Sequence, residues 1–225
     1  MVQKPVVKRN KPLYITVMGT MGSGKTTVAK LISERLRMRL VEENFGDNAF
    51  LPRFYQDMKR WAFHSQTFFL MEKTQQLLAI GRMLGQTVHS RGIVQDTPIE
   101  QDVFSYAKAQ CVLGNMDRAQ WLLYKKIYDS MRTYFPTPDL IIFLDTSIGE
   151  IVKRIEGRGR GFEAKIPVRY IQLLDRLTRE WIKKNPDMRI LPIQTDGLDI
   201  VRNGTSRKKF LEIVSSYLKQ KKLTD

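Results

Sequence analysis

The 225-residue chain is poor in the residues that staple small secreted proteins or build zinc sites. It has one cysteine, Cys111, which has no second cysteine to pair with, and two histidines, His64 and His89. Neither histidine has metal-ligand spacing with a cysteine, so a zinc site is not supported. A single thiol is typical of a reducing compartment, and we expect a cytoplasmic protein.

Long apolar runs are also missing. No stretch of about 18 apolar residues is present, so the sequence predicts no membrane span and no membrane partner. The basic residues near the start of the chain are not followed by the apolar segment of a signal peptide. We expect residues 1–12 to be a flexible basic arm and residues 13–225 to form one domain, because that length suits one α/β domain and is short for two.

Acidic residues are in deficit, with 23 Asp and Glu against 38 Lys and Arg, which gives a formal net charge of +15. Such a charge favours either a nucleic-acid binder or a nucleotide enzyme with a basic phosphate site and basic tails. Much of the excess lies in Lys4–Lys11 and Arg207–Lys222, and no zinc-finger spacing or RNA-recognition aromatic signature is present. Charge alone says little about chemistry. We therefore treat nucleic acid as the less favoured partner and leave a nucleic-acid-binding ATPase as an open alternative.

Apolar runs and helical periodicity alternate along the chain. This alternation predicts an α/β fold, a three-layer sandwich with a five-stranded parallel sheet and helices on both faces. The glycine-rich segment described below makes the expected fold P-loop NTPase-type. The expected strands are Leu13–Met18, Arg39–Glu42, Gly92–Gln95, Leu140–Leu144 and Arg189–Ile193, and the expected helices are Lys25–Arg37, Leu51–Leu84, Gln101–Val112, Asn115–Tyr134, one that ends at Glu156, Pro167–Lys184 and a C-terminal helix.

A glycine-rich segment between the first strand and the first helix fits the pattern G-x-x-x-x-G-K-[ST]. Glycines allow backbone N–H groups to converge on phosphate oxygens, and the helix N-terminus adds partial positive charge. Lys25 would neutralise phosphate charge, and the hydroxyl of Thr26 would hold Mg²⁺. We expect ATP phosphates to be bound by Gly19, Thr20, Met21, Gly22, Ser23, Gly24, Lys25, Thr26 and Thr27, with Mg²⁺ as cofactor.

Further segments follow the glycine-rich loop in a specific order and spacing. They are Glu43–Asn48 (ENFGDN), Phe54–Asp57 (FYQD), Arg60–Gln66 (RWAFHSQ), Asp96–Asp102 (DTPIEQD), Arg154–Glu163 (RIEGRGRGFE) and Asp196–Asp199 (DGLD). Together they resemble the deoxynucleoside kinase family, especially its bacterial deoxyadenosine/deoxyguanosine kinase branch, over nearly the whole chain. The resemblance implies transfer of a phosphoryl group from ATP to the 5′-hydroxyl of a deoxynucleoside in nucleotide salvage. It also implies a homodimer formed through helices of the middle region.

The resemblance assigns roles around the transferred phosphoryl group. Glu43 is placed as the base for the sugar hydroxyl, although an ordinary loop carboxylate is the plainer interpretation. Asp96, at the end of the third strand, would hold Mg²⁺ directly or through water, or else cap a helix. Arg154, Arg158 and Arg160 would belong to a mobile arginine-rich lid at about residues 154–165, for which a solvated basic face is the alternative. Arg154 would contact the ATP phosphates, and Arg158 and Arg160 would take part in catalysis together with Lys25 and Glu43.

The nucleoside would lie against the long second helical region. Gln66 and Asp102 offer the donor and acceptor atoms that read a base edge, and Lys73 falls two helical turns after Gln66. Thymine presents carbonyls where Asp102 requires a donor, so we expect deoxyadenosine, deoxyguanosine or deoxycytidine as substrate and thymidine last. The resemblance implies that Tyr55 and Glu163 hold the 3′-hydroxyl and that Tyr106 stacks on the base. For Tyr106 and Trp61, a place in the ordinary core is the alternative. The expected nucleoside-binding residues are Tyr55, Gln66, Lys73, Asp102, Tyr106 and Glu163.

Two departures from the family pattern bear on activity. Thr97 and Pro98 replace an Arg-Ser pair, and Asn44 replaces a proline after Glu43. If the enzyme is active, another cation must fill the space of the missing arginine, and we expect Arg158 or Arg160 to do so. A thymidylate-like nucleoside monophosphate kinase and a non-catalytic kinase-like subunit remain alternatives. A monophosphate kinase would need an arginine for the acceptor phosphate, and the missing arginine at position 97 disfavours this alternative. The intact Lys25, Thr26 and Glu43 disfavour a non-catalytic subunit.

Overall fold

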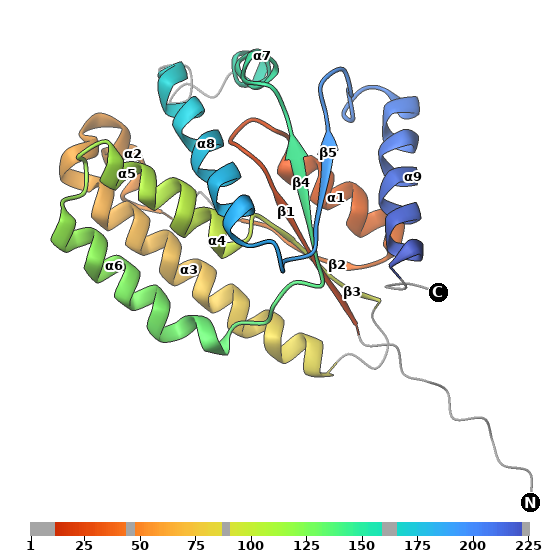
Figure 1. The fold of residues 1–225 in the computed structure, drawn as a ribbon, viewed down its shortest axis with the longest axis horizontal. Coiled ribbons are helices and arrows are strands. Elements are labelled where there is room, and N and C mark those ends of the chain that lie inside the picture. The colour runs from red at the N-terminus through yellow and green to blue at the C-terminus, as the bar shows by residue number, and fades with distance from the viewer. Residues whose placement is uncertain (1–11, 44–47, 87–90, 159–165, 222–225) are drawn as a thin grey trace, which may run out of the picture.

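The computed structural model describes residues 12–43, 48–86, 91–158 and 166–221. These residues form an all-parallel sheet in the strand order β2-β3-β1-β4-β5 (Figure 1). The predicted α/β class and five-stranded sheet are confirmed. The strands are β1 (Leu13–Met18), β2 (Arg39–Val41), β3 (Gly92–Asp96), β4 (Leu140–Asp145) and β5 (Ile190–Gln194).

Helices cover both faces of the sheet, as predicted (Figure 1). On one face α1 and α9 pack their apolar side chains on the strands, and on the other face lie α3, α6, α8 and the short helices between β3 and α6. The helices of the described residues are α1 (Lys25–Leu36), α2 (Leu51–Gln56), α3 (Met58–Gln86), α4 (Ile99–Gln101), η1 (Asp102–Ala107), α5 (Lys108–Val112), α6 (Arg118–Met131), η2 (Arg132–Tyr134), α7 (Ile148–Arg158), α8 (Val168–Lys184) and α9 (Gly204–Gln220).

The central strand β1 is buried along its whole length. A parallel strand covered on both faces reads as a continuous apolar run, because neither face meets water. Ile15 and Val17 contribute to the core beneath α1 and α9, whereas Tyr14 and Met18 belong to clusters on the opposite face. Packing on both faces holds β1 in place, and with it the start of the glycine-rich loop that follows the strand.

Two helical regions differ from the expected single helices. The region that was predicted to be helical from residue 51 to 84 breaks at Asp57 into α2 and α3, and the Asp57 side chain accepts from the N–H of Arg60 in the first turn of α3. The stretch after β3 begins at Ile99 and contains the π-helix η1 between two α-helical pieces. Wide π-turns occur often at functional sites, and η1 carries two of the predicted nucleoside-binding residues.

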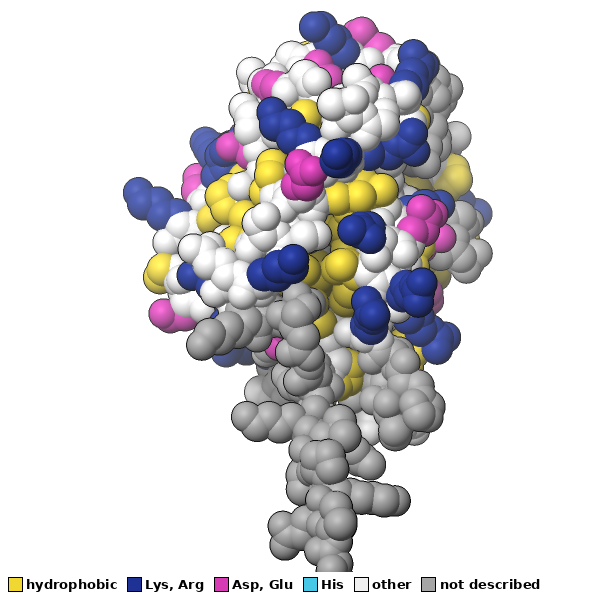
Figure 2. All heavy atoms as spheres, turned by 90° about the vertical axis from the view of Figure 1, so that its right-hand side faces the viewer, with side chains coloured by type: hydrophobic (Ala, Val, Ile, Leu, Met, Phe, Trp, Pro, Cys, Tyr) yellow, Lys and Arg dark blue, Asp and Glu magenta, His cyan; other side chains and the backbone are white. Residues whose placement is uncertain are grey.

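The surface around α9 is basic, as the sequence indicates. Arg207, Lys208 and Lys209 in its first turns are all exposed. Figure 2 shows this side of the molecule, where Lys and Arg side chains outnumber those of Asp and Glu. Within the described residues, no helix combines the length and apolar character required to cross a membrane.

Candidate active site

The glycine-rich loop connects β1 to α1 at the carboxyl end of the sheet. Gly22 and Gly24 have φ angles of 80° and 96°, which lie in the left-handed region that favours glycine. Gly24 is the N-cap of α1, and no side chain caps this helix end. Such an N-terminus, with its partial positive charge, is suited to bind a phosphate. Lys25 Nζ donates to the carbonyl oxygen of Gly19 at 2.9 Å, which holds the ammonium group beside the loop.

A side chain that the sequence did not single out anchors the start of this loop. Gln101 accepts from the N–H of Gly19 at 3.0 Å and donates to the carbonyl oxygen of the same residue at 2.5 Å. The side-chain amide of Gln101 therefore bonds both the N–H and the carbonyl oxygen of Gly19, in a buried position. A lone glutamine beside Asp102 gives no pattern in the sequence from which this contact could be predicted.

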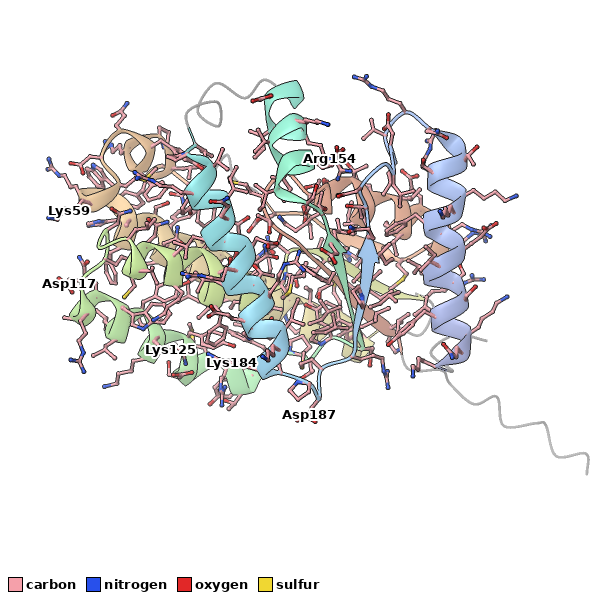
Figure 3. The ribbon with its side chains drawn as sticks, turned by 45° about the horizontal axis from the view of Figure 1, so that its top comes forward. Lys59, Asp117, Lys125, Arg154, Lys184 and Asp187 are labelled. Carbon is pink, nitrogen blue, oxygen red and sulfur yellow. The ribbon has the colours of Figure 1, made fainter. Side chains whose placement is uncertain are left out.

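Helix α7 lies over the glycine-rich loop. A Cβ atom on Gly22 would lie 2.8 Å from Cγ1 of Ile155. Arg154 extends from α7 towards the loop after β5 (Figure 3), where it donates to the carbonyl oxygen of Thr195 at 2.8 Å and to that of Ser23 at 3.0 Å. It also pairs with Glu150 at 3.0 Å. Arg154 is thus fixed beside the loop, and its contact with phosphate stays a prediction.

The remainder of the predicted lid is not part of the described structure. Helix α7 includes Gly157 and ends at Arg158, so the first part of the lid segment is helical. The side chain of Arg158, together with Arg160 and Glu163, lies outside the described residues. The roles expected for these three residues therefore stay predictions.

Thr26 and Asp96 meet at the junction of α1 and β3. The hydroxyl of Thr26 lies 2.5 Å from Oδ2 of Asp96, and the Asp96 side chain is buried. Helix α4 has Pro98 as its N-cap and no side-chain cap, so Asp96 does not cap this helix. A carboxylate and a hydroxyl beside a phosphate loop are hard oxygen donors, and they fit Mg²⁺ that takes its other ligands from water and nucleotide phosphates.

Glu43 follows β2 and lies in the same cavity as the glycine-rich loop. This cavity is lined by Glu43 and also by Lys25, Thr26 and Asp96. The Glu43 side chain is 9% exposed and forms an ion pair with Lys73 at 3.2 Å. The neighbouring Glu42 is exposed and pairs with Lys30 at the surface. The structure therefore separates the two adjacent glutamates, of which one faces the cavity and the other faces solvent.

Most of the predicted nucleoside-binding residues line this same cavity. Within the described residues, the lining includes four of the predicted side chains but not Lys73, which lies behind Glu43 and Asp102. Sequence reasoning missed several lining residues, because apolar and aromatic side chains on a buried helix face look like ordinary core. The predicted residues in the lining are Tyr55, Gln66, Asp102 and Tyr106, and those missed are Leu51, Phe54, Phe69 and Tyr170.

Asp102 and Tyr106 are brought together on η1. Burial raises the pKa of Asp102 well above its usual range, although the positive charge of Lys73 offsets part of this effect. Within the described residues, no donor makes a hydrogen bond to Asp102 Oδ2. An unmatched buried acceptor is costly unless a ligand satisfies it. Burial also raises the pKa of Tyr106, so its phenol stays neutral beside Glu43.

Trp61, by contrast, lies outside the cavity. Its ring stacks on Phe50 at a centroid distance of 5.9 Å, and the guanidinium groups of Arg53 and Arg60 lie over it. Asn48 holds the segment before α2 against α3, because its side-chain Nδ2 donates to Ser65 and its side-chain Oδ1 accepts from the N–H of Phe50. The Trp-containing segment thus packs the start of α3 and brings Gln66, one turn later, to the cavity.

Comparison with known proteins decides the family. A family model described as deoxynucleoside kinase matches residues 15–219. The chain belongs to the deoxynucleoside kinase family. The resemblance seen in the sequence is therefore confirmed, and the protein is a kinase that acts on deoxynucleosides.

Curated members of the family match almost the whole chain. A deoxyadenosine/deoxycytidine kinase of Bacillus subtilis is 31% identical over 210 residues, which cover 92% of this chain and 94% of the relative. A deoxyguanosine kinase of the same organism is 27% identical over 215 residues, with 94% and 98% covered. In fold, the chain is similar to a deoxyadenosine kinase from M. mycoides with bound dCTP, with a TM-score of 0.76 at 23% identity, over 91% of this chain and all of that one.

Within this deoxynucleoside kinase the Thr97–Pro98 departure has a distinct local structure. Thr97 is fully buried and has a φ angle of 63°, which is unusual for a β-branched residue. Its N–H donates to the carbonyl oxygen of Val17, and its hydroxyl donates to Asp96. Its own carbonyl oxygen accepts from Lys73. The position that carries arginine in the family pattern is therefore a tight, buried turn in this chain.

Proposed function

We propose that this kinase uses ATP and Mg²⁺ to phosphorylate the 5′-hydroxyl of a deoxynucleoside whose base carries an exocyclic amine. The observation that carries the proposal is one cavity. Its lining combines Lys25 and Thr26 of the phosphate loop with Glu43 and with Gln66 and Asp102. A donor phosphate at the loop and an acceptor nucleoside at Gln66 and Asp102 would then share one cavity with Glu43.

Each group in the centre of the cavity has a defined task in the transfer. Glu43 accepts the proton of the attacking 5′-hydroxyl, and Lys25 stabilises the charge of the transferring phosphoryl group. Mg²⁺, held by Thr26 and Asp96, would supply further charge neutralisation on the phosphates. Gln101 keeps the loop in place through both of its hydrogen bonds to Gly19.

The base is read by Gln66 and Asp102. Asp102 Oδ2 is an unsatisfied acceptor in the lining, so it favours a base that presents an amine. Adenine, cytosine and guanine carry an amine, whereas thymine would set a carbonyl against the carboxylate. Relatives named as deoxyadenosine, deoxycytidine and deoxyguanosine kinases agree with this range. We propose deoxyadenosine as first substrate and thymidine as last, with Tyr55 and Glu163 at the sugar.

The experiment that tests this function is a phosphorylation screen. The purified protein is incubated with ATP, Mg²⁺ and each nucleoside, deoxynucleoside and deoxynucleoside monophosphate in turn, and products are separated by ion-exchange chromatography. Formation of 5′-monophosphates from deoxynucleosides supports the proposal. Phosphorylation of monophosphates alone would favour a thymidylate-like kinase. Inactivity of the folded protein towards every acceptor would favour a non-catalytic subunit.

We also propose a cytoplasmic homodimer formed through α3 and α6. These helices lie side by side at one edge of the molecule (Figure 1). Four large apolar side chains on them are exposed, namely Met71, Leu78, Leu122 and Leu123. Apolar side chains at such a surface favour a protein interface. Light scattering on the wild type and on Leu122→Asp would show a dimer that the substitution weakens, whereas a monomeric wild type would contradict the proposal.

A further inference from the structure

Lys73 is a fully charged group in the interior of the protein. Its side chain is 2% exposed, although lysine is rarely buried in this way without partners. The carboxylates of Glu43 and Asp102 lie 3.2 Å and 3.8 Å from its ammonium group. These partners stabilise the positive charge of Lys73 in the interior.

Four oxygen atoms surround the ammonium group, and they come from three separate segments. The Glu43 carboxylate, after β2, lies at 3.2 Å, and the Asp102 carboxylate, on η1, lies at 3.8 Å. The carbonyl oxygens of Asp96 and Thr97, at the end of β3, accept at 3.4 Å and 3.0 Å. A side chain of α3 thus joins the three segments that carry the predicted base, the metal ligand and the base-reading carboxylate.

The position of Lys73 differs from the role that the sequence suggests. Helical spacing places it on the face of α3 that carries Gln66, which favours a contact with the nucleobase. In the structure Gln66 lines the cavity, whereas the Lys73 ammonium lies behind the two carboxylates that line it. Lys73 therefore contacts the groups that would touch the substrate.

The turn at Thr97 gives Lys73 a second task. A buried β-branched residue in the left-handed region is strained by about 1–3 kcal/mol and persists only where its surroundings hold it. The carbonyl oxygen of Thr97 accepts the shortest hydrogen bond that Lys73 makes. The same ammonium group that balances Glu43 and Asp102 therefore also fixes the turn that follows Asp96.

We propose that Lys73 is a positioning residue that serves as the shared counter-ion of Glu43 and Asp102. It replaces the arginine that the family pattern places at position 97. Through Glu43 it orients the group that accepts the hydroxyl proton, and through Asp102 it orients the group that reads the base. Without this cation, the two buried carboxylates lose the ammonium group that they share, and each moves away from its working position. The inference rests on the proposed function, because it assigns Glu43 and Asp102 their roles in phosphoryl transfer.

The first test compares Lys73→Met, which keeps the length but removes the charge, with Lys73→Arg, which keeps the charge. We expect Lys73→Met to lower kcat and raise the KM for deoxyadenosine, with a combined loss in kcat/KM of at least about 100-fold. The KM for ATP should stay within about threefold of the wild type. Lys73→Arg should recover most of the loss. Lys59→Met is the matched control, because Lys59 is an exposed lysine at the start of the same helix.

The second test is a double-mutant cycle with Glu43→Gln. If Lys73 acts through Glu43, adding Lys73→Met to Glu43→Gln should lower kcat by less than about threefold, far below its effect in the wild type. Lys73→Gln serves in the same cycle if Lys73→Met does not fold, since Gln retains a donor for Thr97 without the charge. Thermal melts of all variants identify the folded ones. Additive losses in kcat, or an equal loss of affinity for ATP, would overturn the proposal.

Failure of this inference can be told from failure of the proposed function. If the proposed function is wrong, the wild-type protein phosphorylates no deoxynucleoside, and the cycle has no rate to compare. If only the inference is wrong, the wild type is active and Lys73→Met either keeps a normal kcat/KM or loses it equally with and without the Glu43 carboxylate.

Discussion

The hydroxyl of Thr26 lies 2.5 Å from the Oδ2 atom of Asp96, so that the first turn of α1 and the end of β3 share one hydrogen bond. These residues are 70 positions apart in the sequence. They meet because β1 and β3 are adjacent parallel strands, whose carboxyl ends lie at the same edge of the sheet. This pair defines the place where we propose that Mg²⁺ binds.

The first prediction concerns this metal site. Thr26→Val keeps the shape of the side chain and removes the hydroxyl, so we expect the Mg²⁺ concentration for half-maximal activity to rise at least about tenfold. Thr26→Ser keeps the hydroxyl and should shift it by less than about threefold. The measurement is the initial rate over a titration of MgCl₂ at saturating ATP. Identical Mg²⁺ dependence in the two variants would contradict the assignment of Thr26 as a ligand.

The second prediction separates the two charged groups at the centre of the cavity. Glu43→Gln should lower kcat at least about 100-fold and leave the nucleoside affinity largely intact, because the carboxylate acts on the proton in the transition state. Lys25→Ala should lower kcat by a similar factor by removing charge from the phosphoryl group. Steady-state kinetics and isothermal titration with deoxyadenosine test both. A near-normal kcat in Glu43→Gln would show that another group accepts the proton.

The third prediction compares two glycines near α7. Gly22 has a φ angle of 80° and an added Cβ would lie 2.8 Å from Ile155. We expect Gly22→Ala to destabilise the fold by about 2 kcal/mol or more, and to weaken ATP binding, because backbone strain and overpacking add. Gly149 is helical with no atom within 4 Å of such a Cβ. Gly149→Ala should be neutral or stabilise by about 0.5–1 kcal/mol. Urea unfolding of both variants decides the matter, and equal effects would contradict the close packing of α7 on the loop.

The fourth prediction concerns pH and Asp102. Burial, partly offset by Lys73, raises the pKa of Asp102 in the folded state well above the ordinary value of 3.8. The folded state then binds this proton more tightly than the unfolded chain does, so ionisation of Asp102 opposes folding as the pH rises above that value. Asp102→Asn removes this effect. Its free energy of unfolding relative to the wild type should therefore increase from about pH 5 to about pH 8, while its affinity for deoxyadenosine falls.

A control variant accompanies this pH comparison. Asp129→Asn removes an exposed carboxylate that pairs with Lys125 on the surface of α6, and such pairs contribute little to stability. Urea unfolding of the wild type and both variants at the two pH values gives the comparison. If the free energy of unfolding of Asp102→Asn relative to the wild type decreases from pH 5 to pH 8, the buried carboxylate does not oppose folding.

Much of the fold follows from local sequence patterns. The strand Leu13–Met18 is predicted at its observed bounds, because six residues buried on both faces form a continuous apolar run between a proline and a glycine. The π-helix at residues 102–107 is not predictable in this way. Its apolar residues fit an α-helical period as well, and the packing partners of η1, α3 and α8, are distant in the sequence.

The positions of site residues were predictable where a motif fixes the backbone. They were less predictable where a long side chain can reach several different partners. The strand–loop–helix pattern places Lys25 and Thr26, and the ends of parallel strands place Glu43 and Asp96. The direction of Lys73 depends on two carboxylates from other segments, which no spacing along α3 reveals. The expectation that lid arginines fill the space of the missing arginine stays a prediction. Among the described residues, Lys73 forms an ion pair with Glu43.

A competition among the four deoxynucleosides tests whether this kinase selects its substrate through Asp102. They are mixed at equal concentration with ATP, Mg²⁺ and the purified protein, and the monophosphates formed at low conversion are quantified by chromatography. We expect dAMP as the main product and TMP as the least, because Asp102 requires a donor on the base and mismatches at such sites discriminate by about 10⁴. Preferential formation of TMP, or no monophosphate at all, would contradict it.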